Sequence, residues 1–161
     1  MGNRTESAEP ALGETLDFLR LIWAVDHGLQ STSKRMARTL GVTAPQRLVL
    51  RILGVYRSLS AGELAEVLHL HPSTLTGVLS RLEERVLIER EIDPADRRRA
   101  IFRLTEQGQA LNRLQKGTVE QAVRRALQET APEDLRAARA VLGHLARMLT
   151  GDDDQAAETE A

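Results

Sequence analysis

Cysteine is absent from this 161-residue chain, and aromatic residues make up only 2% of it. Without thiols the chain cannot form disulfides, thiolate zinc sites or iron–sulfur clusters, and thiol redox sensing is excluded. With so few aromatic rings, the core has to be built from Leu, Val, Ile and Ala, which favours helices. No apolar run approaches the roughly 20 residues of a membrane-spanning helix, and the polar start is no hydrophobic signal sequence. We therefore expect a soluble, cytoplasmic, single-domain protein.

Lysine is also scarce, since 20 of the 22 basic residues are arginine. The formal net charge is only −1, because acidic residues gather at both ends of the chain. Residues 18–149 contain 21 basic and 14 acidic residues, a net charge of +7. Two basic clusters lie in this interior: residues 34–57, which contain no acid, and the triplet Arg97, Arg98 and Arg99. A basic body fits a polyanionic partner, and it equally fits an arginine surface that only faces solvent.

Apolar residues at helical spacing predict three helices in the first 70 residues. Thr43 and Gln46 form a capping box, in which the two side chains satisfy backbone donors left free at a helix start. Ser60 and Glu63 repeat this pattern ahead of a short helix. The predicted helices cover residues 11–40, with a candidate break at 31–33, residues 45–53, and a third segment that ends near residue 69.

The segment from Pro72 to about residue 85 is predicted to be a fourth helix with two different faces. Pro72 suits the first helical position, where its missing N–H is not needed. The apolar stripe consists of Leu75, Val78, Leu79, Leu82 and Val86. The opposite face carries mostly small polar residues: Ser73, Thr74, Thr76, Gly77, Ser80 and Arg81. A short helix, a tight turn and a second helix with a polar outer face are typical of helix-turn-helix DNA-binding motifs.

After the fourth helix the apolar spacing changes to alternation, which predicts a β-hairpin from residues 88–92 and 100–104. Asp93, Pro94 and Asp96 supply turn residues, and the arginine triplet lies near the tip. We call residues 88–104 the wing. Arginines at such a tip fit the electronegative minor groove of DNA or its flanking phosphates.

The rest of the chain is predicted to form two further helices. Thr105 can cap a fifth helix that extends to about residue 127 and is weakened at Gly108 and Gly117. Pro132 opens a sixth helix, which reaches residue 149 and carries acidic residues in its first turn, as the helix dipole favours. Residues 151–161 are expected to be an acidic disordered tail, and residues 1–10 a disordered N-terminus.

The specific motifs of the chain lie between residues 60 and 108. They are His71-Pro72-Ser73-Thr74-Leu75-Thr76, Arg81-Leu82-Glu83, Leu87-Ile88-Glu89-Arg90, Asp93-Pro94-Ala95-Asp96-Arg97-Arg98 and Leu104-Thr105-Glu106-Gln107-Gly108. With these motifs the chain resembles the MarR family of bacterial winged helix-turn-helix transcription regulators. The resemblance implies a mainly α fold with a small β-hairpin wing. It implies one domain over residues 11–150, with a DNA-binding lobe at 43–104 and dimerisation helices at 11–40 and 106–149.

By the same resemblance, the protein would be a homodimeric repressor that binds double-stranded DNA at a pseudo-palindromic operator. The recognition helix would enter the major groove and the wing the minor groove, and a small anionic or aromatic ligand would release the DNA. The implied DNA contacts are His71, Ser73, Thr74, Thr76, Ser80, Arg81, Arg97, Arg98 and Arg99. Asp96 matches the carboxylate that holds the wing arginine and shapes the loop.

Two positions depart from the family pattern. Val86 stands where a glycine commonly ends the recognition helix, and Arg99 stands where a small residue often follows the wing arginine. The turn after the fourth helix and the placement of the wing therefore depend on residues that the family does not usually have there.

Members of the family commonly hold small aromatic anions in a crevice. The resemblance therefore implies a candidate site for an effector ligand. Trp23 and His27 are four residues apart on the first helix, and Arg47 and Arg51 are four apart on the second. Together they would supply an aromatic stack and a cation. The alternative is that Trp23 packs in the dimer core while the arginines contact phosphates or solvent. Because cysteine is absent, the thiol-based peroxide switch of some relatives is excluded.

The sequence contains little that indicates another class of function. It contains no nucleophile elbow, phosphate loop, glycine fingerprint or pair of catalytic carboxylates, so we predict that the chain is not an enzyme. Its four histidines lack metal-ligand spacing, and we predict neither a metal nor a cofactor. The alternative to DNA binding is a helical protein-interaction module whose arginines bind an acidic partner. Such a module does not need a wing.

Overall fold

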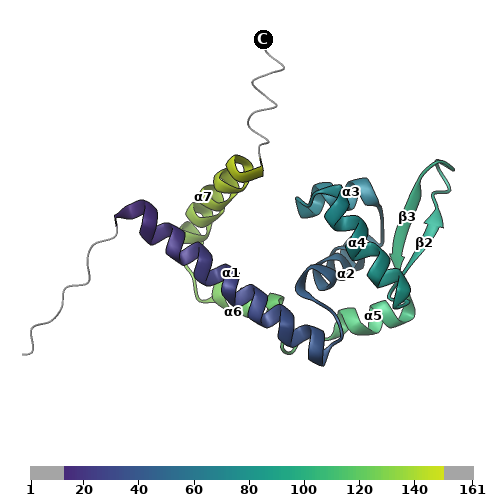
Figure 1. Ribbon diagram of the computed structural model, residues 1–161, viewed down its shortest axis with the longest axis horizontal. Helices are drawn as coiled ribbons and strands as arrows, with labels where there is room; N and C mark the ends of the chain where they lie inside the picture. Colours follow the sequence, from purple (N-terminus) through teal and green to yellow (C-terminus); the bar gives the residue numbers. More distant parts are fainter. Residues whose placement is uncertain (1–12, 151–161) are drawn as a thin grey trace, which may run out of the picture. The chain divides into compact units, whose positions relative to one another are not determined.

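The computed structural model describes residues 13–150, which fold into helices and one small antiparallel sheet (Figure 1). The tails expected at residues 1–10 and 151–161 lie outside the described residues. The chain divides into two compact units, residues 1–119 and 120–161, and each is described by itself. The first unit contains α1 (Glu14–Thr39), α2 (Ala44–Tyr56), β1 (Ser58–Ser60), α3 (Ala61–Leu68), α4 (Pro72–Glu84), β2 (Ile88–Ile92), β3 (Ala100–Leu104) and α5 (Glu106–Arg113). The second unit contains α6 (Val119–Gln128), apart from its first residue, and α7 (Pro132–Thr150). The prediction of a mainly α protein with a small β-hairpin is confirmed.

The capping signals of the sequence lie at the starts of α2 and α3, as predicted. The Thr43 N–H donates to Gln46 Oε1 at 2.9 Å. At α3 the Ser60 N–H donates to Glu63 Oε2 at 2.7 Å, while the Glu63 N–H donates to Ser60 Oγ at 3.3 Å. In both cases a side chain satisfies a donor that the helix leaves unpaired.

The candidate break in the first helix is wrong, because α1 continues through residues 31–33 without interruption. The hydroxyl of Ser33 accepts a hydrogen bond from the Ala44 N–H at 2.9 Å. Ala44 is the first residue of α2, so its N–H has no partner inside that helix. The serine therefore joins α1 to α2 instead of ending α1.

The single fifth helix that the apolar spacing predicted is also wrong, because residues 114–118 separate α5 from α6. Leu114 has an extended backbone, and Gly117 has a φ of 74°. The guanidinium of Arg47 on α2 donates to the carbonyls of Leu111, Asn112 and Leu114. Because Arg47 takes these carbonyls at the end of α5, they are not left to a continuing helix.

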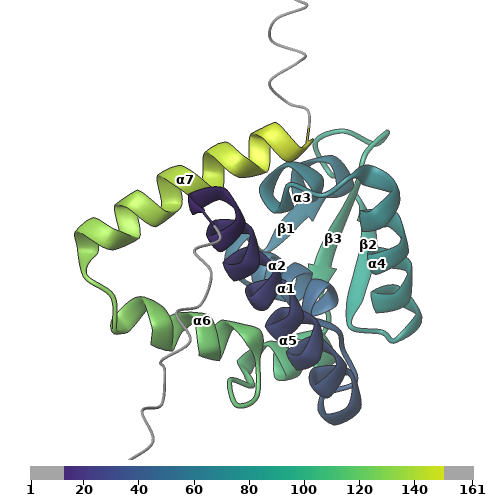
Figure 2. The same ribbon diagram turned by 60° about the vertical axis from the view of Figure 1, so that its left-hand side comes forward.

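The sheet has β3 in its centre, between β1 and β2 (Figure 2). The predicted hairpin is confirmed, with Ile88 opposite Leu104 and Ile92 opposite Ala100. Burial does not follow the predicted alternation throughout: Ile92 is 68% exposed, and Ile101 is buried like its neighbour Phe102. The sequence analysis missed β1, because a strand of three residues is too short to show a period.

The core of the first unit is formed by α2, α3, α4 and the sheet. Its buried residues are Val42, Val49, Leu50, Leu53, Leu64, Leu75, Leu79, Leu82, Leu87, Ile88 and Phe102. Leu75, Leu79 and Leu82 are the inner stripe predicted for α4. Val86 does not belong to that stripe as predicted, since it lies beyond the end of α4 and is 59% exposed. None of the helices within residues 13–150 has the length and apolar character needed to cross a membrane.

Candidate nucleic-acid interface

The outer face of α4 is polar and exposed. It consists of Ser73, Thr74, Thr76, Ser80 and Arg81, all of which are exposed in the structure. A Cβ added at Gly77, on the same helix, would meet nothing within 4 Å apart from its chain neighbours and the backbone of its own helix. The Thr76 hydroxyl donates back to the Pro72 carbonyl at 2.9 Å, and the Ser80 hydroxyl donates to Glu84 Oε1 at 3.2 Å. This face can approach another surface closely and offers it hydroxyl groups and one guanidinium.

His71 fixes the start of α4. Its Nδ1 accepts a hydrogen bond from the Ser73 N–H at 3.3 Å and lies 2.8 Å from Ser73 Oγ. Just before it, His69 ends α3 in the left-handed region with a φ of 49°. A left-handed residue followed by a capped helix gives the tight turn that a helix-turn-helix motif needs. The sequence analysis gave His69 no role, and only its place in the turn could have pointed to one.

Val86 ends α4 at the position where the resemblance led us to expect a glycine. Its φ is 53°, a left-handed conformation that a β-branched residue adopts only with strain. The Val86 N–H donates to the Glu83 carbonyl at 2.8 Å, and the Leu87 N–H donates to the Leu82 carbonyl at 2.9 Å. These two bonds form a Schellman motif. Val86 therefore makes the turn that a glycine would make.

The loop of the wing is organised by two aspartates. Asp96 Oδ1 accepts from the Arg98 N–H at 3.0 Å and from the Arg98 Nε at 3.3 Å, and these bonds lower the pKa of Asp96. Asp93 Oδ1 accepts from the Ala95 N–H at 2.9 Å. The Arg98 side chain is 91% exposed, so most of its guanidinium faces outward. Asp96 thus shapes the loop, and Arg98 presents positive charge beyond it.

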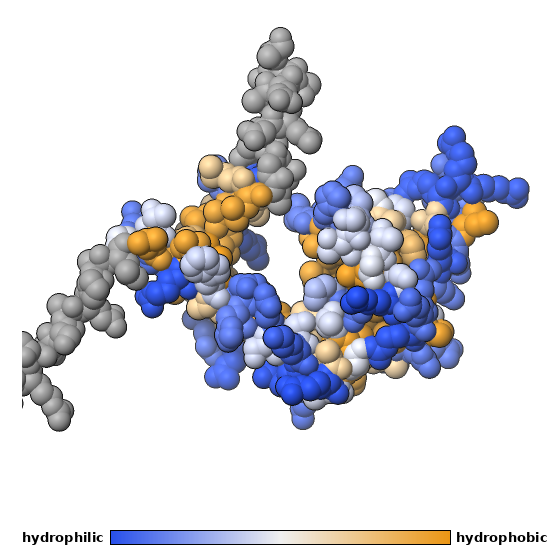
Figure 3. Space-filling view, in the orientation of Figure 1, coloured by the Kyte–Doolittle hydropathy of each residue, from blue (hydrophilic) through white to orange (hydrophobic). Residues whose placement is uncertain are grey.

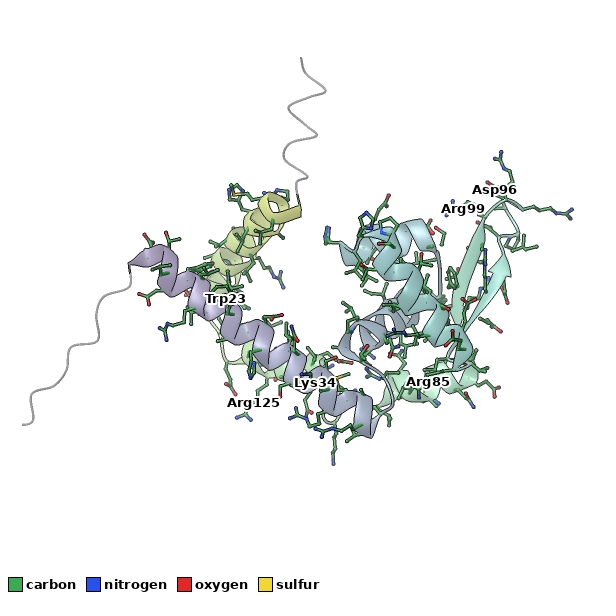
Figure 4. The ribbon with its side chains drawn as sticks, in the orientation of Figure 1. Trp23, Lys34, Arg85, Asp96, Arg99 and Arg125 are labelled. Carbon is green, nitrogen blue, oxygen red and sulfur yellow. The ribbon has the colours of Figure 1, made fainter. Side chains whose placement is uncertain are left out.

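Arg99, labelled beside Asp96 near the tip of the wing in Figure 4, has a different set of bonded partners from Arg97 and Arg98. Its Nη2 lies 3.0 Å from both Glu63 Oε1 and Ser60 Oγ, at the start of α3. The Ser60 N–H and hydroxyl, followed by Arg99, lower the pKa of Glu63 to about 2. Arg97 has no hydrogen bond or ion pair with any described residue. The sequence grouped the three arginines as contacts, whereas the structure ties Arg99 to α3.

A hollow of about 320 Å³ lies along the wing. Its lining includes four arginines, Arg90, Arg97, Arg98 and Arg99, and one acid, Glu91. Among these groups, the exposed guanidinium groups of Arg97 and Arg98 suit an anion such as a phosphate.

The four residues predicted to contact an effector have different surroundings. Trp23 and His27 are exposed on α1, and Trp23 is 65% exposed. Arg47 is 1% exposed and donates to α5 carbonyls, while Arg51 Nη1 donates to the carbonyl and the Oδ1 of Asn112, both at 3.0 Å. We call Arg47, Arg51 and their partners on residues 111–114 the α2–α5 joint. The fold itself thus accounts for the position of both arginines, and the alternative that Arg47 contacts phosphates or solvent is wrong.

Apolar side chains are exposed along α1 and α7. On α1 they are Leu16, Phe18, Leu19, Leu21, Trp23, Val25 and Leu29. On α7 they are Val141, Leu142, Met148 and Leu149, and Figure 3 shows hydrophobic residues in orange along this helix.

In residues 13–150 no group of three His, Asp or Glu side chains could hold a metal ion.

Comparison with known proteins gives matches at the level of family and of fold. The model of the MarR family matches residues 42–100, from just before α2 to the start of β3. The HTH-type transcriptional regulator YfiV of Bacillus subtilis, itself uncharacterized, is 32% identical over 124 residues, which cover 76% of this chain and 75% of that protein. The organic hydroperoxide resistance transcriptional regulator of the same species is 33% identical over 91 residues, or 56% of this chain and 62% of its own length.

Among solved structures, a mutant of MarR from E. coli in complex with operator DNA is similar, with a TM-score of 0.66 and 24% identity. The match covers 85% of this chain and 99% of that one. At this identity the likeness shows the fold alone, which is the winged helix-turn-helix fold implied by the sequence motifs.

Proposed function

The chain belongs to the MarR family of transcriptional regulators, and on that premise we propose that it is a homodimeric repressor of a pseudo-palindromic DNA operator. The observation that carries the proposal is the presence of an exposed polar α4 face and an arginine-bearing wing in one compact unit. In this proposal α4 enters the major groove and the wing meets the minor groove. Ser73, Thr74, Thr76, Ser80 and Arg81 would face base edges and phosphates.

Each DNA-contacting group has a chemical task in this proposal. The hydroxyls of α4 can donate to or accept from base edges and phosphates, and Arg81 can place paired donors on a guanine. His71 is proposed to cap α4 beside the phosphates. Arg97 and Arg98, both of which are exposed, would supply most of the salt-dependent attraction from the wing.

Dimerisation is supported by the apolar residues that α1 and α7 leave exposed in a single chain. Exposed apolar area of this extent marks an interaction surface. We propose that residues 11–40 and 106–149 carry the dimer contacts and residues 43–104 the DNA contacts. Two symmetric copies would read half-sites about one helical turn, roughly 34 Å, apart.

Release of the operator by a small anionic or aromatic ligand is part of the proposal, with Trp23 and His27 as its contacts on α1. Such a ligand would favour a dimer whose two α4 helices no longer match the half-site spacing. Like its regulator relatives, the chain is proposed to act without catalysis, in the cytoplasm, where it can reach promoter DNA.

The test is fluorescence anisotropy with DNA from upstream of the protein's own gene and with a shuffled duplex of equal length, at two salt concentrations. We expect the native duplex to bind about a thousandfold more tightly. Equal, salt-sensitive binding of both duplexes would contradict a specific operator in this DNA. Absence of binding at low salt, together with binding of an acidic peptide, would replace the regulator by the protein-interaction module.

A further inference from the structure

Arg97, Arg98 and Arg99 are consecutive in sequence but have three different environments. Arg98 is bonded to Asp96 inside the wing loop, and Arg97 is not bonded to any side chain or main-chain group among residues 13–150. Arg99 alone of the three bonds to another element, since its Nη2 reaches Glu63 Oε1 and Ser60 Oγ, both at 3.0 Å. Its Nε is also 4.0 Å from Asp93 Oδ2. One guanidinium therefore contacts two carboxylates and a hydroxyl.

The acceptor at α3 is held in place independently of Arg99. Glu63 Oε2 accepts from both the Ser60 N–H, at 2.7 Å, and the Ser60 hydroxyl, at 2.8 Å. Ser60 also ends β1 and pairs with Ile101 of β3, two residues after Arg99. The Arg99 bond thus closes a ring of contacts through β3, β1 and the start of α3.

We propose that Arg99 is a positioning residue, which fixes the wing against α3 and so sets the separation between the wing and α4. This inference rests on the proposed DNA-binding function, in which wing and α4 contact two grooves at once. Because α3 packs against α4, a wing tied to α3 is also tied to the recognition helix. The wing loop, residues 93–99, lies beyond the paired strands of the sheet, and fixing it in advance lowers the entropy lost on binding.

The surroundings of Arg99 argue against a direct phosphate contact. The carboxylates of Glu63 and Asp93 flank its guanidinium, and they would repel an approaching phosphate. A carboxyl with the ordinary pKa of 4.5 is already charged at neutral pH, and the pKa of Glu63 is lowered further, to about 2. Arg98, with 91% of its side chain exposed, has no such screen of two acids.

The first test compares operator affinity and its salt dependence in Arg99→Ala, Glu63→Gln and the double variant, with Arg98→Ala as the matched control. Gln keeps the capping box at α3, because its side-chain oxygen still accepts from Ser60. We expect Arg99→Ala and Glu63→Gln each to weaken binding about fivefold, and the double variant no further. Arg99→Ala should leave the salt slope unchanged, whereas Arg98→Ala should reduce it by about two, one for each subunit of the dimer. Arg99→Lys should restore part of the affinity.

Two outcomes of this experiment overturn the inference. If Arg99 contacts a phosphate, Arg99→Ala reduces the salt slope as Arg98→Ala does, and Glu63→Gln strengthens binding by removing a negative charge near DNA. If Arg99→Ala binds like the unchanged protein, the tie has no role in positioning. Groove-specific footprinting adds a readout that a loss of stability would not reproduce. In Arg99→Ala we expect minor-groove protection at the wing to weaken without being lost, so that the phosphate contacts of the wing still count in the salt slope, while major-groove protection at α4 remains.

The second test uses the free protein and so does not depend on the operator. Hydrogen exchange of the Asp93 and Arg99 amides, which bond to the Arg99 and Asp96 carbonyls, reports whether the wing loop is held. We expect exchange to be several times faster in Arg99→Ala and Glu63→Gln, with the free energy of global unfolding lowered by less than about 1 kcal/mol. Unchanged exchange would contradict the inference even if the operator binds. Faster exchange in the variants of a protein that binds no operator would contradict the proposed function. It would still support the role of Arg99 in holding the wing against α3.

Discussion

Arg47 in the α2–α5 joint and Arg98 on the wing are the same residue type in opposite surroundings. Arg47 is 1% exposed, and its guanidinium donates to main-chain carbonyls at the end of α5, where the helix dipole is negative. The Arg98 side chain is 91% exposed, and the only group it bonds among the described residues is Asp96. The comparison shows that a guanidinium fork can complete a helix end inside the fold or present charge outside it. Residue type alone does not decide between the two.

The largest expected effect is a difference in the free energy of unfolding between a variant of the α2–α5 joint and a variant of the wing. Arg47→Leu should lower the free energy of unfolding by about 3 kcal/mol, because it removes the buried guanidinium that donates to the carbonyls of Leu111, Asn112 and Leu114. Arg97→Leu, on the wing, should change it by less than about 0.5 kcal/mol. Urea denaturation of both variants measures the difference. Equal effects would show that the joint does not depend on its arginine.

A second contrast uses two glycines, one inside the fold and one on the outer face of α4. A Cβ at Gly108 would overlap the main-chain carbonyl of Leu87, whereas one at Gly77 would meet nothing within 4 Å. Gly108→Ala should therefore lower the free energy of unfolding by about 2 kcal/mol. Gly77→Ala should raise it by about 0.5 kcal/mol, because alanine favours the helix. Thermal melts measure the direction of both changes in stability. A Gly108→Ala variant as stable as the unchanged protein would refute the close packing of α5 on Leu87.

The wing should respond to acid through Glu63, whereas the arginines of the joint donate to carbonyls, which do not titrate. The pKa of Glu63 is about 2 in the folded chain, compared with 4.5 as the ordinary value. Its contribution to stability is therefore complete above pH 4.5 and is lost as the pH falls towards 2. We expect a loss below about 1 kcal/mol, since the pair with Arg99 is half exposed. Unfolding free energies at pH 5 and pH 3 should differ less in Glu63→Gln than in the unchanged protein.

The smallest effect on stability is expected at Val86, just beyond the end of α4. Val86→Gly removes the strain of a β-branched residue at a φ of 53°, worth roughly 1–2 kcal/mol, and adds backbone entropy to the unfolded chain. The net result should be a gain of about 0.5 kcal/mol in the free energy of unfolding. A loss of stability in urea denaturation would mean that the valine side chain makes contacts that outweigh its strain.

The parts of the fold that the sequence predicted are those whose causes lie within a few residues. Thr43 with Gln46, and Ser60 with Glu63, are three residues apart, and both helix starts lie where these pairs indicate. The polar face of α4 follows from helical spacing, so the exposure of its five residues was predictable. The wing strands followed from alternation and turn residues over one short segment.

The parts that were not predicted have distant causes. The gap between α5 and α6 depends on Arg47, whose bond to Leu111 joins residues 64 positions apart. The position of Arg99 depends on Ser60, 39 residues away. Periodicity carries no information on such pairs, and three-residue strands such as β1 give no period at all.

Ser60 has a consequence for the order in which the wing folds. Its bonds to Glu63 span three residues and need only the first turn of α3, which forms on the timescale of helix nucleation. Its pairing with Ile101 and its bond to Arg99 must wait for a loop of about 40 residues to close. The wing should therefore pack against the start of α3 late in folding, after Ser60 and Glu63 have formed the helix cap. In the native ensemble it should be among the first parts to open.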